Sequence, residues 1–292
     1  MNDMNDEKNQ PQMRLLALDT ATAVMAAAVV EAHSQQLIEE KNIHGERNHS
    51  VHVLTGLQEL MLETGTAREQ IAGLAVGIGP GSYTGVRIAV TAAKTLAWAW
   101  KVPVVGVSTL QALAWGGWNL AQSGEAAQHP VESQAGGGGT VAPPVQADES
   151  DYIQWIVPLL DARRGQVYTS LFAAAGNAEP HRLAPDVIRL MTSWVEELVQ
   201  LVKDTSPEER PKAIYLVGET EVHHHAATEL SELLELRSQP YELEGRWIGR
   251  LGATRLQNGQ ADELHTLVPN YTQLAEAEVN LLRARSKGAA ST

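Results

Sequence analysis

A glycine-rich loop at residues 77–87, GIGPGSYTGVR, has the residue types that often bind phosphate at the start of a helix. A Walker A loop requires G-x-x-x-x-G-K-[ST], with a second glycine five positions after the first. Five positions after Gly77, Gly79 and Gly81 the sequence has Ser, Thr and Val instead of glycine. The dinucleotide fingerprint G-x-G-x-x-G begins at Gly77 and Gly79 and then meets Ser82. Neither motif is complete. Two interpretations stay open: a nucleotide site, or a tight strand-to-helix turn in which Ser82 or Thr84 caps the helix.

Two aspartates stand where apolar runs lead into short turns. Asp19 follows RLLAL and precedes TAT, and Asp161 follows YIQWIVPLL and precedes ARRG. In proteins of the actin, Hsp70 and sugar-kinase type, two such hairpins face each other and hold a metal-bound nucleotide phosphate. Asp19, Thr20 and Asp161 are therefore candidates for nucleotide binding in an ATP-using, kinase-like enzyme. The first turn lacks the glycine usual there, and aspartate is common in ordinary turns, so the pattern favours a shared fold over nucleotide binding.

The histidines do not have the spacing of a metal site. His44, His49 and His52 precede or begin a helical pattern, and residues 223–225 are three consecutive histidines. A metal-binding pair on one helix face needs i, i+4 spacing, whereas His49 and His52 are three apart. Solvated or capping histidines are the simpler interpretation. The chain has no cysteine, which excludes thiolate chemistry, and we predict no metal.

Alternating strand and helix patterns place these residues in two halves of an α/β fold. In the first half we expect strands at 14–18, 24–32, 37–43, 71–79 and 102–108, and helices at about 50–64, from Thr84 to Trp100, and from Thr109. In the second half we expect strands at 152–160, 166–174 and 213–218, and helices at 194–203, 226–236 and 247–259. Because a strand ending in aspartate, a turn and a returning strand occur in both halves, we predict two domains of related design with mixed sheets flanked by helices.

The predicted domains are 14–118 and 152–278. Residues 119–151 contain four consecutive glycines, a Pro-Pro pair and several acids, which predicts a disordered, low-complexity insertion. We also predict a disordered N-terminal tail at 1–13 and a C-terminal tail at 279–292.

Charge and composition limit the classes of partner. The net charge is −13 and no segment is strongly basic, so tight RNA binding by this chain alone is not expected, although a local basic patch fits the composition. The polar start lacks the apolar core of a signal peptide, and no apolar run is long enough to span a membrane. We expect a cytoplasmic protein.

The helix after the glycine loop has polar and aromatic residues on the face opposite its apolar stripe. Arg87, Thr91, Thr95 and Trp98 share that face, and Lys94 lies beside it. The tryptophan could pack under another element, or it could contact a partner, since Trp and Arg are favoured at the centres of interfaces.

Several motifs together resemble the TsaB (YeaZ) family. They are LLALDTATAVMAAAVV, NHSVHVL, GIGPGSYTGVRIAVTAAKTLAW, PLLDARRGQVY and VPNY, in that order over 14–118 and 152–278. The resemblance implies two domains of the actin/Hsp70 (ribonuclease H-like) type. It also implies a non-catalytic scaffold subunit for making threonylcarbamoyladenosine in tRNA, paired with the catalytic protein TsaD. The ATPase TsaE joins this pair, tRNA is contacted only through the complex, and the subunit self-associates when TsaD is absent.

The resemblance also assigns residues. It implies no catalytic residue and no cofactor, and a partner surface on the helices at about 50–64 and from Gly85 onward. The interface candidates are Val53, Leu57, Met61, Arg87, Val90, Lys94 and Trp98. The candidates for a structural loop that sets the helix angle are Gly79, Pro80, Gly81, Ser82, Thr84 and Gly85.

Two positions depart from the family pattern. Gln273 stands where P-x-Y-x-R has arginine, and residues 218–220 are GET where the family has G-D-G. The second departure argues further against a nucleotide site. A peptidase, the remaining alternative, has no nucleophile–base pair or metal pair in the sequence.

Overall fold

The computed structural model describes residues 12–44, 49–123 and 153–272, without the side chains of 49–52. The N-terminal sheet has the strand order β3-β2-β1-β4-β5. Its strands are β1 (Arg14–Asp19), β2 (Val24–Glu31), β3 (Leu37–His44), β4 (Ile71–Gly77) and β5 (Val104–Val107). The first three form an antiparallel meander, and β4 and β5 run parallel to β1.

The C-terminal sheet repeats this topology in the order β10-β9-β6-β7-β8. Its strands are β6 (Gln154–Asp161), β7 (Gln166–Ala174), β8 (His181–Leu190), β9 (Ala213–Gly218) and β10 (Glu235–Pro240). Here too a three-strand antiparallel meander is followed by two parallel strands. Asp19 and Asp161 end the equivalent strands β1 and β6. The predicted fold class, two mixed sheets of the actin/Hsp70 (ribonuclease H-like) type flanked by helices, is confirmed.

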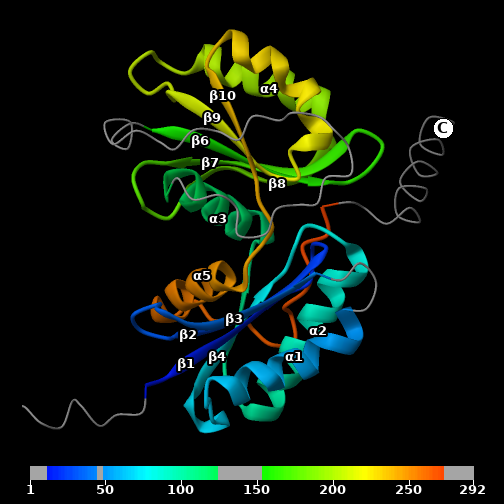
Figure 1. The fold of residues 1–292 in the computed structure, drawn as a ribbon, viewed down its shortest axis with the longest axis vertical. Coiled ribbons are helices and arrows are strands. Elements are labelled where there is room, and N and C mark those ends of the chain that lie inside the picture. Colours follow the sequence, from blue (N-terminus) through cyan, green and yellow to red (C-terminus); the bar gives the residue numbers. More distant parts are fainter. Residues whose placement is uncertain (1–11, 45–48, 124–152, 273–292) are drawn as a thin grey trace, which may run out of the picture.

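The helices form layers outside and between the two sheets (Figure 1). Helices α1 (His49–Glu63) and α2 (Tyr83–Trp100) cover the outer face of the N-terminal sheet, and α4 (Met191–Asp204) packs on the outer face of the C-terminal sheet. Helices α3 (Thr109–Ser123) and α5 (Gly245–Gln257) lie between the sheets and contact each other. Short 3-10 turns occur at η2 (Arg68–Gln70), η3 (Glu221–His223) and η4 (His225–Glu232).

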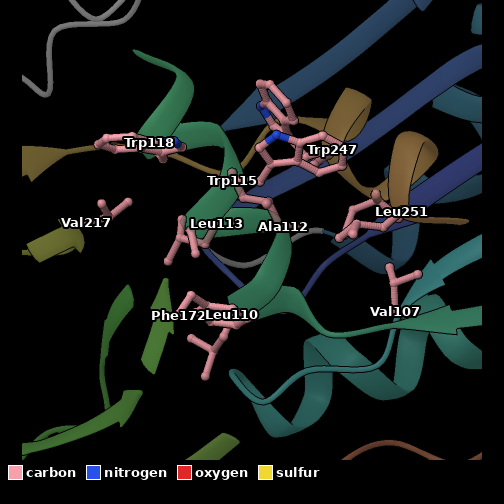
Figure 2. Close-up of a cluster of buried hydrophobic side chains, with 14 of the residues drawn as sticks. Val107, Leu110, Ala112, Leu113, Trp115, Trp118, Phe172, Val217, Trp247 and Leu251 are labelled. Atoms are coloured by element: carbon pink, nitrogen blue, oxygen red, sulfur yellow. The ribbon is translucent and has the colours of Figure 1, made fainter. Parts of the chain in front are cut away.

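The two inner helices each pack on the sheet of the other half. Helix α3 follows β5 but packs on β6, β7, β9 and β10, whereas α5 follows β10 but packs on β1, β2, β4 and β5. The rings of Trp115 in α3 and Trp247 in α5 lie 5.3 Å apart between centroids (Figure 2). Trp118 meets Tyr215 edge-on, with 5.1 Å between ring centroids. Such buried side chains each contribute about 2–3 kcal/mol of transfer free energy, so one apolar core holds both halves together.

Two strands were absent from the sequence prediction. The pattern of 226–236 predicted a single helix, but the structure has η4 over its first part and β10 from Glu235. β8 also went unpredicted because it is an edge strand that contains Pro185 and has no fully buried residue. The predicted tails and insertion at 1–13, 119–151 and 279–292 lie wholly or mostly outside the described residues.

None of the helices that the structure describes is long and apolar enough to cross a membrane.

Candidate partner-binding surface

The glycine loop packs against the turn that follows β1. Gly77 and Gly85 are the tightest positions, because a Cβ atom would lie 1.6 Å from Asp19 Oδ2 at Gly77 and 1.9 Å from the Thr20 carbonyl oxygen at Gly85. The Thr20 hydroxyl donates to the Gly85 carbonyl (2.7 Å), and Ser82 N donates to the Ala21 carbonyl (2.7 Å). The glycines therefore allow two backbone segments more than 50 residues apart to lie in direct contact.

Asp19 is fully buried beneath this loop. Its Oδ1 accepts a hydrogen bond from Ala21 N and its Oδ2 accepts one from Thr109 Oγ1, both at 2.6 Å. Thr109 Oγ1 in turn accepts from Gly79 N (3.0 Å). Burial raises the pKa of Asp19 to about 6, and the two hydrogen bonds offset part of that effect. Asp19 thus joins the end of β1, the glycine loop and the start of α3.

The second aspartate turn makes separate contacts. Asp161 Oδ1 lies 3.2 Å from Nε2 of the buried His223, and Asp161 N donates to Glu219 Oε2 (2.6 Å). Burial raises the pKa of Glu219, and the nearby carboxylates of Asp161 and Glu242 raise it further. Within the described ranges, no hydrogen bond or ion pair joins Asp161 to Asp19, and no group of three His, Asp or Glu side chains could hold a metal.

Helix α2 begins directly after the loop. Ser82 is its N-cap residue, and the Ser82 hydroxyl accepts a hydrogen bond from Gly85 N (3.3 Å). The apolar stripe of α2 faces the sheet, so Tyr83, Arg87 and Trp98 are left exposed on the other side. Arg87 Nη1 donates to Tyr83 Oη (3.1 Å), which fixes both side chains at the start of the helix.

An open groove of about 530 Å³ lies between α1 and α2. Leu54 of α1, which is 58 % exposed, forms one side, and Ile88 and Leu96 of α2 form the other. The remaining lining residues are Val53, Thr84, Arg87, Thr91, Ala92 and Thr95.

A second hollow, of about 390 Å³, lies between α2 and residues 267–271. Lys94 holds this segment in place, because its Nζ donates to the carbonyl oxygens of His265 (3.1 Å) and Leu267 (2.9 Å). The Tyr271 ring packs against Tyr83, with 5.3 Å between ring centroids.

These features together form what we call the α1–α2 surface: the exposed sides of α1 and α2 with residues 267–271. Twelve large apolar side chains are exposed in the described part of the chain, and half of them lie on this surface. They are Leu54, Leu62, Tyr83, Trp98, Val268 and Tyr271. Groups of exposed apolar side chains are typical of association surfaces.

Comparisons with known proteins point to one family. The chain is 28 % identical over 280 residues to the threonylcarbamoyladenosine biosynthesis protein TsaB of Bacillus subtilis, covering 94 % of this chain and 100 % of that protein. It is 39 % identical over 111 residues to TsaB of Escherichia coli, covering 36 % of this chain and 45 % of that protein. The structure of YeaZ from Pseudomonas aeruginosa aligns with a TM-score of 0.60 at 20 % identity, covering 89 % of this chain and 99 % of that chain. The chain is thus similar to TsaB (YeaZ) proteins over nearly its whole length.

The family model for TsaD, tRNA N6-adenosine threonylcarbamoyltransferase, also matches residues 34–133. This match covers the N-terminal strands after β2, the glycine loop and helices α1 to α3. This chain is thus similar to TsaD over the segment that contains α1 and α2.

The structure divides the seven interface candidates into exposed, half-buried and buried residues. Arg87 and Trp98 are exposed, and Met61 and Lys94 are half-buried. Val53, Leu57 and Val90 are each less than 5 % exposed and belong to the core beneath the helices. The interface candidates did not include the outer residues Leu54, Leu62, Tyr83 and Ile88.

The six loop candidates lie where α2 starts. Gly79, Pro80 and Gly85 are buried, Gly81 is half-buried, and Ser82 and Thr84 are exposed. The first family departure, Gln273, and the side chains of His49 and His52 lie outside the described residues. At the second departure, Glu219 accepts the hydrogen bond from the Asp161 backbone described above.

Proposed function

We propose that this chain is a non-catalytic subunit in the biosynthesis of threonylcarbamoyladenosine in tRNA, and that it binds and activates a TsaD-type transferase through the α1–α2 surface. The curated relatives named TsaB support the pathway. The observation that carries the binding role is the groove between α1 and α2, which exposed Leu54 lines, together with the exposed Trp98 on α2.

Several properties of this surface suit a protein partner. The groove is open and lined mainly by apolar and hydroxyl side chains, while Arg87 lies at its edge. Interfaces of this kind place large apolar side chains at the centre and charged ones at the rim. Because a TsaD-type protein resembles this chain over the same segment, its equivalent helices could pack against α1 and α2. The same surface would allow self-association when the partner is absent, and TsaE would join the pair.

The alternative, an ATP-using kinase-like enzyme, gains no support from the geometry. Asp19 and Thr20 are both fully buried and hydrogen-bonded within the fold, so neither presents an oxygen to a metal-bound phosphate. We therefore assign no catalytic residue to this chain and place the transfer chemistry on the partner.

The test combines association and activity. We expect Leu54→Glu to weaken binding to the host's TsaD-type protein by about 10-fold or more, since a charge would be buried in an apolar contact. Leu183→Glu makes the same change at an exposed leucine of β8 and should leave the affinity unchanged. Binding is measured by calorimetry, and threonylcarbamoyl transfer to tRNA is measured with and without this chain.

Equal transfer activity in the absence of this chain would contradict the proposal. Equal affinities for the wild type, the Leu54 variant and the Leu183 control would show that the partner binds elsewhere.

A further inference from the structure

The turn between β6 and β7 holds two consecutive arginines in the left-handed region. Arg163 has φ +63° and Arg164 has φ +54°, and Gly165 follows at φ +73°. Gln166 N donates to the Arg163 carbonyl (2.9 Å), which closes a four-residue turn with Arg164 and Gly165 at its centre. Two central residues with positive φ are the combination found in type I′ hairpin turns, where Asn-Gly is the favoured pair. Arginine therefore occupies a position that local backbone preference would give to asparagine.

The backbone of this turn is held without help from the arginine side chains. Ala162 N donates to the Gln166 carbonyl (2.9 Å), and Met191 N at the start of α4 donates to the Gly165 carbonyl (2.9 Å). Arg163 and Arg164 are both exposed, and neither guanidinium group makes a hydrogen bond or ion pair within the described ranges. The neighbouring Arg189, by contrast, is paired with Glu197. The turn thus presents two uncompensated guanidinium groups on a chain whose net charge is −13.

We infer that the Arg163–Arg164 turn contacts the phosphodiester backbone of RNA. The planar guanidinium group donates paired hydrogen bonds that match phosphate oxygens. Residues held in unfavourable backbone conformations are typical of functional positions. Neither arginine lines the grooves described above, so an extended polyanion fits this exposed turn better than a mononucleotide. The choice of RNA over an acidic protein rests on the proposed function.

Two arginines on an acidic protein position a polyanion rather than bind it tightly. Each phosphate contact contributes to the salt dependence of binding, so the contact is expected at low salt and in the complex, where a partner supplies further contacts.

The test replaces both arginines in the full-length chain. Arg163→Asn with Arg164→Asn removes two charges, and asparagine tolerates the left-handed conformation, so the melting temperature should not fall. Arg68→Asn with Lys203→Asn removes two charges from exposed positions elsewhere and is the matched control. Fluorescence anisotropy measures the affinity for a labelled, unmodified tRNA transcript between 50 and 200 mM salt, with the chain alone and with the host's TsaD-type protein.

We expect the turn variant to bind this tRNA about 5- to 10-fold more weakly at low salt, with a slope of log K against log salt smaller by about 1 to 2. The control should match the wild type. The inference is overturned if the wild type binds no RNA in either arm, if both variants lose equal affinity, or if polyglutamate competes as well as RNA. A different result would contradict only the proposed function. If the turn variant loses RNA binding in the isolated chain, but the wild type does not associate with the TsaD-type protein, the proposed function fails and this inference stands.

Discussion

The buried carboxyl group of Asp19 should make the stability of this protein depend on pH in an unusual direction. Its pKa is raised from 3.8 to about 6 because burial disfavours the charged form. A carboxyl group whose pKa is higher in the folded state than in the unfolded state stabilises the fold below pH 4. That contribution is lost as the pH rises through about 6. This sign is opposite to that of a surface aspartate in an ion pair.

The size of the effect follows from the two pKa values. The pKa of Asp19 differs by about two units between the unfolded and folded states. At 1.36 kcal/mol per pKa unit, ionisation of Asp19 lowers the free energy of unfolding by about 3 kcal/mol. The Asp19→Asn variant cannot ionise, but its amide oxygen can still accept the hydrogen bond from Ala21 N. The stability of this variant relative to the wild type should therefore improve by about 2–3 kcal/mol between pH 4 and pH 7.

Urea unfolding followed by circular dichroism at a series of pH values measures this difference. Taking the difference between variant and wild type cancels the titration of the other carboxylates. Asp204→Asn, at an exposed position at the end of α4, controls for the loss of a carboxylate as such. A difference between Asp19→Asn and the wild type that stays constant with pH, or that changes in the opposite direction, would refute the reasoning.

Two further predictions concern packing. Gly85→Ala places a Cβ atom 1.9 Å from the Thr20 carbonyl oxygen, and we expect a loss of about 2–3 kcal/mol by urea unfolding; an unchanged midpoint would mean that the loop can move away from the β1 turn. Trp118→Ala empties a site in the core between the sheets and removes the hydrogen bond from Nε1 to the Gly176 carbonyl (2.9 Å). It should cost about 3–5 kcal/mol, and a loss below 1 kcal/mol would contradict the shared core.

Local sequence signals predicted the repeated part of the fold. A short apolar run, an aspartate and a small-residue turn identified both β1 and β6, because buried strands and their turns have distinct compositions. The same reasoning failed at β8 and β10, where exposed and buried positions alternate weakly and the strand character comes from pairing with a neighbour. Edge strands depend on tertiary contacts that a single sequence does not contain.

The interface candidates lie on the correct two helices, but some of them lie on the face that packs against the sheet. The family resemblance assigns Val53, Leu57 and Val90 to the partner surface, and the structure places these in the core. A helix that packs on a sheet and also presents an exposed apolar edge has two apolar stripes, and periodicity identifies only the stronger one. Leu54 and Ile88, one or two residues away, could be assigned to the outer side only once the sheet beneath the helices was known.

The role of the glycine loop depends on a contact that no motif encodes. The spacing of its residues excludes the standard phosphate motifs. The sequence does not reveal, however, that the turn after β1 occupies the space that side chains at Gly77 and Gly85 would need. Thr20 and Asp19 are buried by that contact, and the same contact fixes Gly85 at the first turn of α2. The position of α2, and with it one wall of the groove, therefore depends on the buried carboxyl group of Asp19 and on two buried glycines, Gly77 and Gly85. It follows that substitutions at Asp19 or Gly85 should change partner affinity only through the position of α2, whereas substitutions at Leu54 should change it directly and leave stability nearly unaltered.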